Sequence, residues 1–189
     1  MKENLTRAFI CLPLPEEVKM RITRLAAQKK AENPGFKWVG DFQYHITLKF
    51  CGSLTTAQLA DLKENVGQKL ASDPPGKIRL VPGHLGAFPN LRRARVVFLE
   101  VGGETKKLEK LAALVESAAI AAGLPKEDRP FHPHITLART KSPEPLENPP
   151  EDAAAIPAWT AETALLMQSD LKPSGPVYTK LHEWKLEKN

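Results

Sequence analysis

The stretch His45-Ile46-Thr47-Leu48 occurs a second time, unchanged, as His134-Ile135-Thr136-Leu137. The chain has only five histidines among its 189 residues, so composition alone does not account for the repeat. Both copies have the chemistry of a strand, because β-branched Ile and Thr favour an extended backbone. The repeat therefore predicts two similar strands that lie 89 positions apart in the sequence.

Side chains alternate between the two faces of a strand, so the histidine and threonine of each copy share one face. The isoleucine and leucine take the other face, which we expect to be buried against helices. Two similar elements in so short a chain suggest an old duplication, in which two half-structures related by a pseudo-two-fold axis face each other across a groove. That groove would hold His45, Thr47, His134 and Thr136.

The composition is that of a globular chain with a modest basic surplus. A length of 189 residues allows one domain or two small lobes with a shared core, and a hydrophobic content of 42% is ordinary. The net charge of +5 favours polyanionic partners without selecting one. No stretch reaches the roughly 18 apolar residues of a membrane span, and the apolar segment Ala8–Leu14 lacks a cleavage site after it. We therefore expect a cytoplasmic protein with no membrane partner, in which Cys11 and Cys51 are small buried hydrophobes.

The remaining periodicities predict alternating strands and helices. Helices are expected from Pro15 to Asn33, after a cap at Thr55 or Thr56, and over Glu104–Ala122. The proline-rich stretch Ser142–Pro157 is expected to be a loop. Strands are expected at Arg7–Leu14, Trp38–Val39, Tyr44–Phe50, Ile78–Pro82, Ala94–Val101, Pro133–Arg139, Trp159–Met167 and Val177–Leu186.

These elements together predict an α+β fold. We expect two pseudo-symmetric lobes, each a mainly antiparallel sheet with helices on its outer face, that flank a central cleft. The lobes would form a single bilobal domain over residues 1–189.

Two histidines that face each other across a groove suit the hydrolysis of a phosphodiester. An imidazole has an ordinary pKa of about 6.5, so one ring can accept a proton while the other donates one. In-line displacement at phosphorus needs both actions, on opposite sides of the phosphorus atom. The hydroxyls of Thr47 and Thr136 can bind the non-bridging oxygens, and Arg139 offers a bidentate fork for them.

Other candidate residues have both a structural and a functional interpretation. His84, His132 and His182 are expected to be structural, although His132 could support His134 if the strand extends that far. The arginines at 92, 93 and 95 could contact an RNA backbone or form a solvated strand edge. Aromatic side chains could stack on a base or pack in the core, namely Phe9, Trp38, Phe42 and Tyr44.

Motifs for metals and nucleotide cofactors are missing from the sequence. It contains no His-x-Asp, His-Glu-x-x-His or Cys-x-x-Cys, and no glycine-rich phosphate loop. We therefore expect neither a cofactor nor a metal ion. A metal-dependent phosphoesterase remains an alternative, which loss of activity in a chelator would reveal.

The segments around both motifs resemble the 2H phosphoesterase superfamily, and in particular the RNA 2′,3′-cyclic phosphodiesterases, historically called 2′-5′ RNA ligases. The resemblance runs almost end to end. Its landmarks occur in order at Arg7–Ile10, His45–Phe50, Gly86–Pro89, Arg95–Val97, Pro133–Arg139 and Ser169–Tyr178.

The resemblance implies two lobes around a water-filled cleft and a metal-free reaction that opens a 2′,3′-cyclic phosphate on RNA to a 2′-phosphate. It implies that His45 is the general acid toward the 3′ oxygen and His134 the general base that activates water. Thr47, Thr136 and Arg139 would hold the phosphate. The expected partner is an RNA or oligonucleotide with a cyclic phosphate end, with tRNA as one candidate, bound by a monomer.

Two further alternatives stay open. A ligase would use the same site in reverse to make a 2′-5′ bond. A module that only binds RNA ends would not need two proton-transfer groups.

Overall fold

The computed structural model describes residues 5–147, 155–173 and 175–187, which form three α-helices, two short 3-10 turns and nine strands. The strands belong to one curled antiparallel sheet in the order β7-β4-β5-β6-β3-β1-β8-β9, with β2 paired to β6. None of the helices in these ranges has the length and apolar character to cross a membrane.

The sheet consists of two halves that meet where β3 pairs with β6. In chain order, the first half contains β1 (Thr6–Pro13), α1 (Glu16–Glu32), β2 (Lys37–Trp38), a 3-10 turn (Asp41–Gln43), β3 (His45–Leu54) and α2 (Thr56–Ser72). The second contains β4 (Ile78–Phe88), a 3-10 turn (Leu91–Arg93), β5 (Ala94–Gly103), α3 (Thr105–Ala121), β6 (His134–Glu144) and β7 (Trp159–Ala161). The chain then returns to the first half with β8 (Thr163–Lys172) and β9 (Gly175–Lys185).

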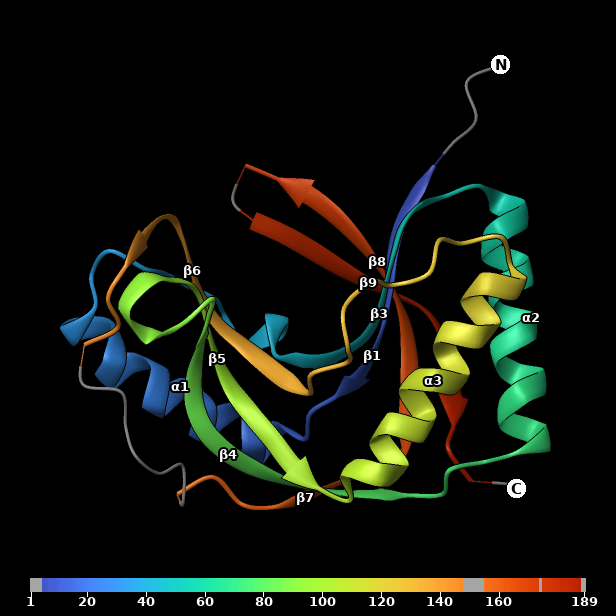
Figure 1. The fold of residues 1–189 in the computed structure, drawn as a ribbon, viewed down its shortest axis with the longest axis horizontal. Helices are drawn as coiled ribbons and strands as arrows, with labels where there is room; N and C mark the ends of the chain where they lie inside the picture. The colour runs from blue at the N-terminus through green and yellow to red at the C-terminus, as the bar shows by residue number, and fades with distance from the viewer. Residues whose placement is uncertain (1–4, 148–154, 174, 188–189) are drawn as a thin grey trace.

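Each half is built around a strand, a helix and a motif strand that pairs back on the first strand. β1, α1 and β3 form this unit in one half, and β5, α3 and β6 form it in the other. The expected α+β class and the mainly antiparallel sheets are confirmed. The two sheets are also joined, because Ile46 of β3 pairs with Ile135 of β6. In Figure 1, α2 and α3 lie together on one side of the molecule and α1 lies on the opposite side.

Apolar faces of the helices and strands fill one core. Thr55 caps the start of α2, as the sequence predicts. The Thr55 hydroxyl accepts from the Gln58 amide at 3.1 Å, and Gln58 Oε1 accepts from the Thr55 amide at 3.1 Å. Both cysteines are buried free thiols, as expected, and burial raises the pKa of each to about 12. The apolar residues of both repeats are buried: Ile46, Leu48, Ile135 and Leu137.

Three predicted boundaries were wrong. β4 runs without a break to Phe88, through a bulge between Pro82 and Leu85, whereas the predicted strand ended at Pro82. The predicted strand Trp159–Met167 is interrupted at Glu162, because β7 pairs with β4 and β8 with β1. β6 extends into the predicted loop 142–157 as far as Glu144, which pairs with Ala94. Residues 148–154 of that predicted loop lie outside the described residues.

A bulge interrupts β3 at the last residue of the first motif. Ile10 of β1 pairs with Lys49 and Cys11 pairs with Thr47, so Leu48 has no partner on β1. An unpaired extra residue of this kind reverses the alternation of the side chains that follow it.

The same bulge occurs in β6 at the last residue of the second motif. Val97 of β5 pairs with Ala138 and Phe98 pairs with Thr136, so Leu137 has no partner on β5. The internal symmetry therefore extends from the sequence repeat to the backbone irregularity that ends it.

The two bulges decide which later side chains face the groove. Lys49 and Ala138, one residue beyond each bulge, are buried. Phe50 and Arg139, two residues beyond, are exposed on the face that carries the histidines. Strict alternation would have placed them on the opposite face.

Candidate active site

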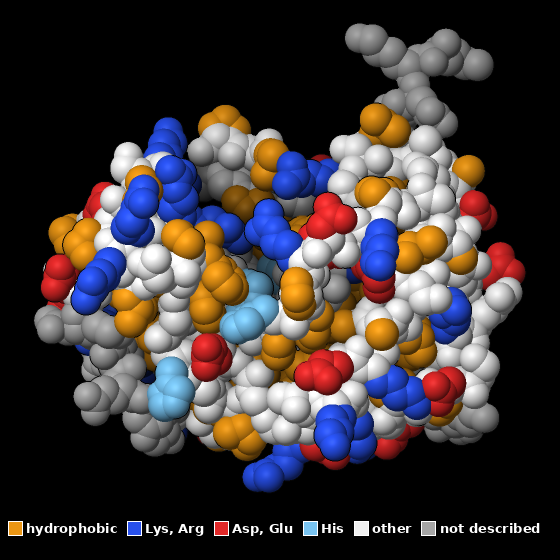
Figure 2. Space-filling model, viewed as in Figure 1, with side chains coloured by type: hydrophobic (Ala, Val, Ile, Leu, Met, Phe, Trp, Pro, Cys, Tyr) orange, Lys and Arg blue, Asp and Glu red, His pale blue; other side chains and the backbone are white. Residues whose placement is uncertain are grey.

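The two repeated motifs meet where β3 pairs with β6. Ile46 stands opposite Ile135 in antiparallel register. One step along each strand from this pair places the histidine of one motif beside the threonine of the other, on the face opposite the isoleucines. All four side chains are half-buried: His45, Thr47, His134 and Thr136. Figure 2 shows His side chains at a hollow near the middle of the visible face, with hydrophobic side chains beside them and Lys and Arg side chains above.

The His134 ring has a defined tautomer. Its Nδ1 lies 2.7 Å from the backbone carbonyl oxygen of His132. A carbonyl only accepts hydrogen bonds, so Nδ1 carries the hydrogen and Nε2 keeps its lone pair in the neutral ring. His134 can therefore accept a proton at Nε2.

The His45 ring is oriented in the same way. It forms a hydrogen bond with the backbone of Gln43, which also lies two residues before its histidine. Since this bond favours the protonated ring, the ring donates and the carbonyl accepts. Both imidazoles are thus held by the carbonyl two residues upstream, a relationship that the motif itself does not reveal.

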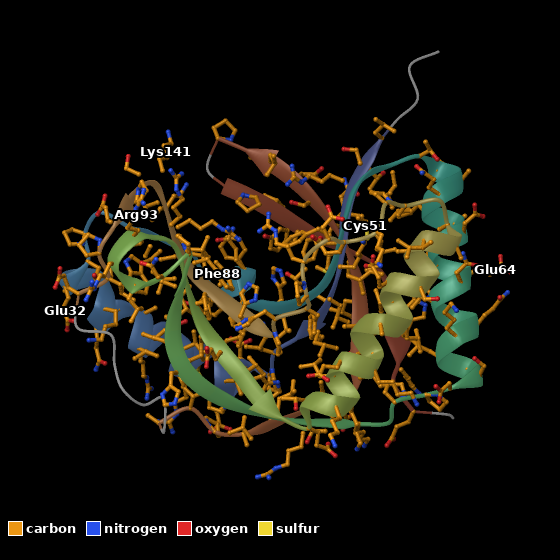
Figure 3. All side chains as sticks on the ribbon, in the orientation of Figure 1. Glu32, Cys51, Glu64, Phe88, Arg93 and Lys141 are labelled. Atoms are coloured by element: carbon orange, nitrogen blue, oxygen red, sulfur yellow. The ribbon has the colours of Figure 1, made fainter. Side chains whose placement is uncertain are left out.

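Aromatic rings from four other strands enclose the two imidazoles. The His45 ring lies 4.8 Å from the ring of Phe9 on β1 and 5.6 Å from that of Tyr178 on β9, centroid to centroid. The His134 ring lies 5.4 Å from Phe88 on β4 and 5.3 Å from Phe98 on β5. Phe88 stands near the centre of the molecule in Figure 3. These rings replace water around the imidazoles.

Both imidazoles are held in their neutral form. Burial, and then the charges of His134 and Arg139, lower the pKa of His45 to about 4, against the opposing effect of its backbone hydrogen bond. Burial also lowers the pKa of His134, followed by the charges of His132 and Arg139. An anion placed between the two rings would act in the opposite direction on both pKa values.

Arg139 brings a positive charge to this group. Its Nη2 lies 3.5 Å from the Thr136 hydroxyl oxygen. Its charge helps to lower the pKa of His45 and of His134, and it opposes the burial that raises the pKa of Tyr178, so the guanidinium lies within electrostatic range of all three. The arrangement therefore offers two imidazoles, two hydroxyls and a guanidinium to one anion.

A cavity of about 980 Å³ opens from Thr47 and His134. Its walls come from β3, the end of β4, the start of β5, α3 and residues 127–132. Lys49 and Glu116 also line it and form an ion pair at 2.8 Å. The site is thus continuous with a space much larger than a phosphate group.

Some of the other residues that the sequence suggested lie at the site, and others lie elsewhere. Phe9 packs on His45, and His132 and Arg95 line the cavity. Tyr44 is buried and Trp38 packs against the core, whereas Phe42 is 63% exposed. His182 packs on Trp184 with ring centroids 4.9 Å apart. Within the described ranges, no three His, Cys, Asp or Glu side chains are grouped so that they could hold a metal ion.

Sequence reasoning missed the rings that complete the site. Tyr178, Phe88 and Phe98 come from strands far from either motif. Tyr178 and Phe88 did belong to the landmarks of the resemblance, which was the only signal in the sequence that could have found them.

Comparisons with known proteins give a consistent result. Residues 14–170 match the model of the 2′-5′ RNA ligase superfamily. The chain is 38% identical to the RNA 2′,3′-cyclic phosphodiesterase of Thermus thermophilus over 95% of its length and 90% of that protein. It is 32% identical to the protein of the same name from Bacillus subtilis over 94% of its length and 95% of that protein.

Solved structures share the fold. The crystal structure of TT0787 of Thermus thermophilus superposes with a TM-score of 0.81 at 34% identity and covers 95% of this chain and 97% of that one. The crystal structure of E. coli LigT complexed with 3′-AMP superposes with a TM-score of 0.82 at 26% identity and covers 97% and 99%.

Proposed function

Because this chain belongs to the 2′-5′ RNA ligase superfamily, we propose that it hydrolyses 2′,3′-cyclic phosphates at RNA ends to 2′-phosphates, with two histidines as general acid and base. The names of its relatives support the substrate and the reaction. The observation that carries the mechanism is the register of β3 on β6, which puts both histidines and both threonines on one face.

His134 is the proposed general base. Its Nδ1–H is committed to the His132 carbonyl, so Nε2 takes the proton from the attacking water. The water oxygen forms a bond to phosphorus as it loses this proton.

His45 is the proposed general acid. The bond from phosphorus to the 3′ oxygen breaks on the side opposite the water, and the protonated His45 ring gives its proton to that oxygen. The products are a 3′-hydroxyl and a 2′-phosphate. His134 then loses its proton to solvent, and His45 takes up a proton from solvent when the next substrate binds.

The phosphate is held by Thr47, Thr136 and Arg139. The threonine hydroxyls donate to non-bridging oxygens, and the guanidinium provides charge-assisted hydrogen bonds. Negative charge develops on these oxygens during displacement, so donors fixed in place stabilise the transition state.

Bound substrate favours the protonated form of His45 that the general acid requires. A pKa of about 4 leaves the His45 ring neutral in the empty site at pH 7. The bound phosphate is an anion between two imidazoles and favours a charged ring. We therefore expect the protonated form to accumulate only in the complex.

The composition of the site also favours a single functional unit made of both halves. Each half supplies one histidine and one threonine, and only the joined sheet brings them together. We therefore propose that residues 1–189 act as a single bilobal domain and that one chain is sufficient for activity.

The test is incubation of the protein with short RNAs that carry a 2′,3′-cyclic phosphate, in excess chelator. We expect a 2′-phosphate end. Failure to open the ring, a 3′-phosphate product or a requirement for a divalent ion would contradict the proposal. Addition of an RNA with a 5′-hydroxyl tests the reverse reaction, and binding without turnover would identify a recognition module.

A further inference from the structure

The cavity beside His134 is larger than the cyclic phosphate needs. Sites for small organic ligands occupy about 300–1,000 Å³, and this cavity of about 980 Å³ is at the upper end of that range. Of the residues that line it, only Thr47 and His134 belong to the group proposed to do the chemistry. The other lining residues come mainly from β3, β5, α3 and residues 127–132.

The cavity has an apolar wall suited to an aromatic base. Phe88 and Phe131 line it, together with Pro89, Pro130 and Val96. Phe88 is 36% exposed although it stacks on Phe98 with ring centroids 4.3 Å apart, so part of its ring remains open to a ligand. Bases stack on such rings without regard to sequence.

Two guanidinium groups line the same space. Arg95 comes from β5 and Arg129 from the connection between α3 and β6. Neither forms an ion pair with any carboxylate in the part of the chain that the structure describes. Arg95 donates from Nη1 to the Lys141 carbonyl at 3.2 Å.

Among the acids that line the cavity, only Glu116 forms an ion pair in the part of the chain that the structure describes. Glu116 is paired with the buried Lys49 and also accepts from the Glu127 amide at 2.7 Å. Glu109 and Glu127 are exposed lining residues. Two carboxylates therefore stand against two guanidinium groups, and a phosphate in the cavity would lie at the arginines and away from Glu109 and Glu127.

From this combination we propose that the cavity binds the nucleotide that precedes the cyclic end, with its base on the wall of Phe88 and Phe131 and its phosphate at Arg95 and Arg129. This inference rests on the proposed function and adds to it a preference for substrates of two or more nucleotides. A cyclic mononucleotide would occupy the reacting end alone.

The test compares two substrates with the same terminal nucleoside: a 2′,3′-cyclic mononucleotide and the dinucleotide that ends in it. We expect kcat/KM for the dinucleotide to be about tenfold higher, as for a charge-assisted contact. Replacement of the internal phosphate by an uncharged methylphosphonate should remove most of this gain in the unmodified protein.

The variants Arg95→Gln and Arg129→Gln should lower the ratio of the two kcat/KM values. The methylphosphonate should then cause little further loss. The matched control is Arg24→Gln, an exposed arginine on α1 outside the cavity, which should keep the full ratio.

Equal kcat/KM for both substrates in the unmodified protein would overturn the inference, as would variants that slow both substrates equally. These outcomes differ from failure of the proposed function, in which neither substrate is hydrolysed. The methylphosphonate comparison needs no variant, so a folding defect in one of them does not block the test.

Discussion

Phe50 and Arg139 occupy equivalent places in the two halves of the molecule, five residues after His45 and His134 and two beyond the bulged leucine of each motif. Both face the groove. The halves therefore match up to the bulge and differ beyond it, where one presents a ring and the other a guanidinium. The fixed positive charge for an anion comes from the second half.

Replacement of this charge should weaken both binding and turnover. We expect Arg139→Ala to lower kcat/KM by about a hundredfold, because a charge-assisted bidentate contact is lost. Arg139→Lys keeps the charge but not the bidentate geometry, so its kcat/KM should lie between those of the unmodified protein and Arg139→Ala. Steady-state kinetics on a cyclic-phosphate RNA measure this, and full activity of Arg139→Ala would remove the residue from the site.

Each histidine should be essential. Loss of a general acid or base costs roughly a hundred- to ten-thousandfold, so His45→Ala and His134→Ala should each reduce hydrolysis by that amount. His182→Ala is the matched control, since that ring packs on Trp184 outside the cavity. If either active-site variant kept more than half of the activity while folded by circular dichroism, the assignment would fail.

A sulfur substrate should separate the roles of the two rings. With sulfur at the 3′ bridging position the leaving group is a thiolate, which needs little protonation because a thiol has a pKa near 8.5. The defect of His45→Ala should shrink on this substrate, while that of His134→Ala should persist. The reverse pattern would exchange the roles. Equal defects on both substrates would mean that neither ring protonates the 3′ oxygen.

The pH profiles should show that bound substrate raises the pKa of His45. The value of kcat/KM reports the free enzyme, in which the pKa of His45 is about 4, so the loss of the acid should lower it as pH rises through about 4. The value of kcat reports the complex, in which the bound anion raises that pKa. Its decline should therefore begin at higher pH. Coincident profiles would show that the phosphate does not alter the protonation of His45.

The buried Lys49 should matter for stability. Its Nζ contacts Glu116 Oε2 at 2.8 Å and donates to the Pro125 carbonyl at 2.9 Å. Loss of one partner from a buried pair costs about 3 kcal/mol, so Lys49→Met should lower the free energy of unfolding by about that amount. Lys49→Met combined with Glu116→Leu should recover much of the loss. Urea unfolding measures both, and an unaffected single variant would show that the pair is weak.

The sequence alone determined the repeat, the faces of its strands and most helices. Alternation put His45 and Thr47 on one face because the β period is two, and Thr55 marked a helix start because its hydroxyl can accept from a free amide. The landmarks also identified the family. All of these depend on residues close together in the chain.

The tertiary structure decided which further residues complete the site. Arg139 is an odd number of positions from His134, so only the bulge at Leu137, created by the register with β5, turns it to the same face. Tyr178 and Phe88 reach the histidines from β9 and β4, and the burial they help create lowers the pKa of both rings. Register and burial depend on which distant strands pair, and no local pattern in the chain encodes that choice.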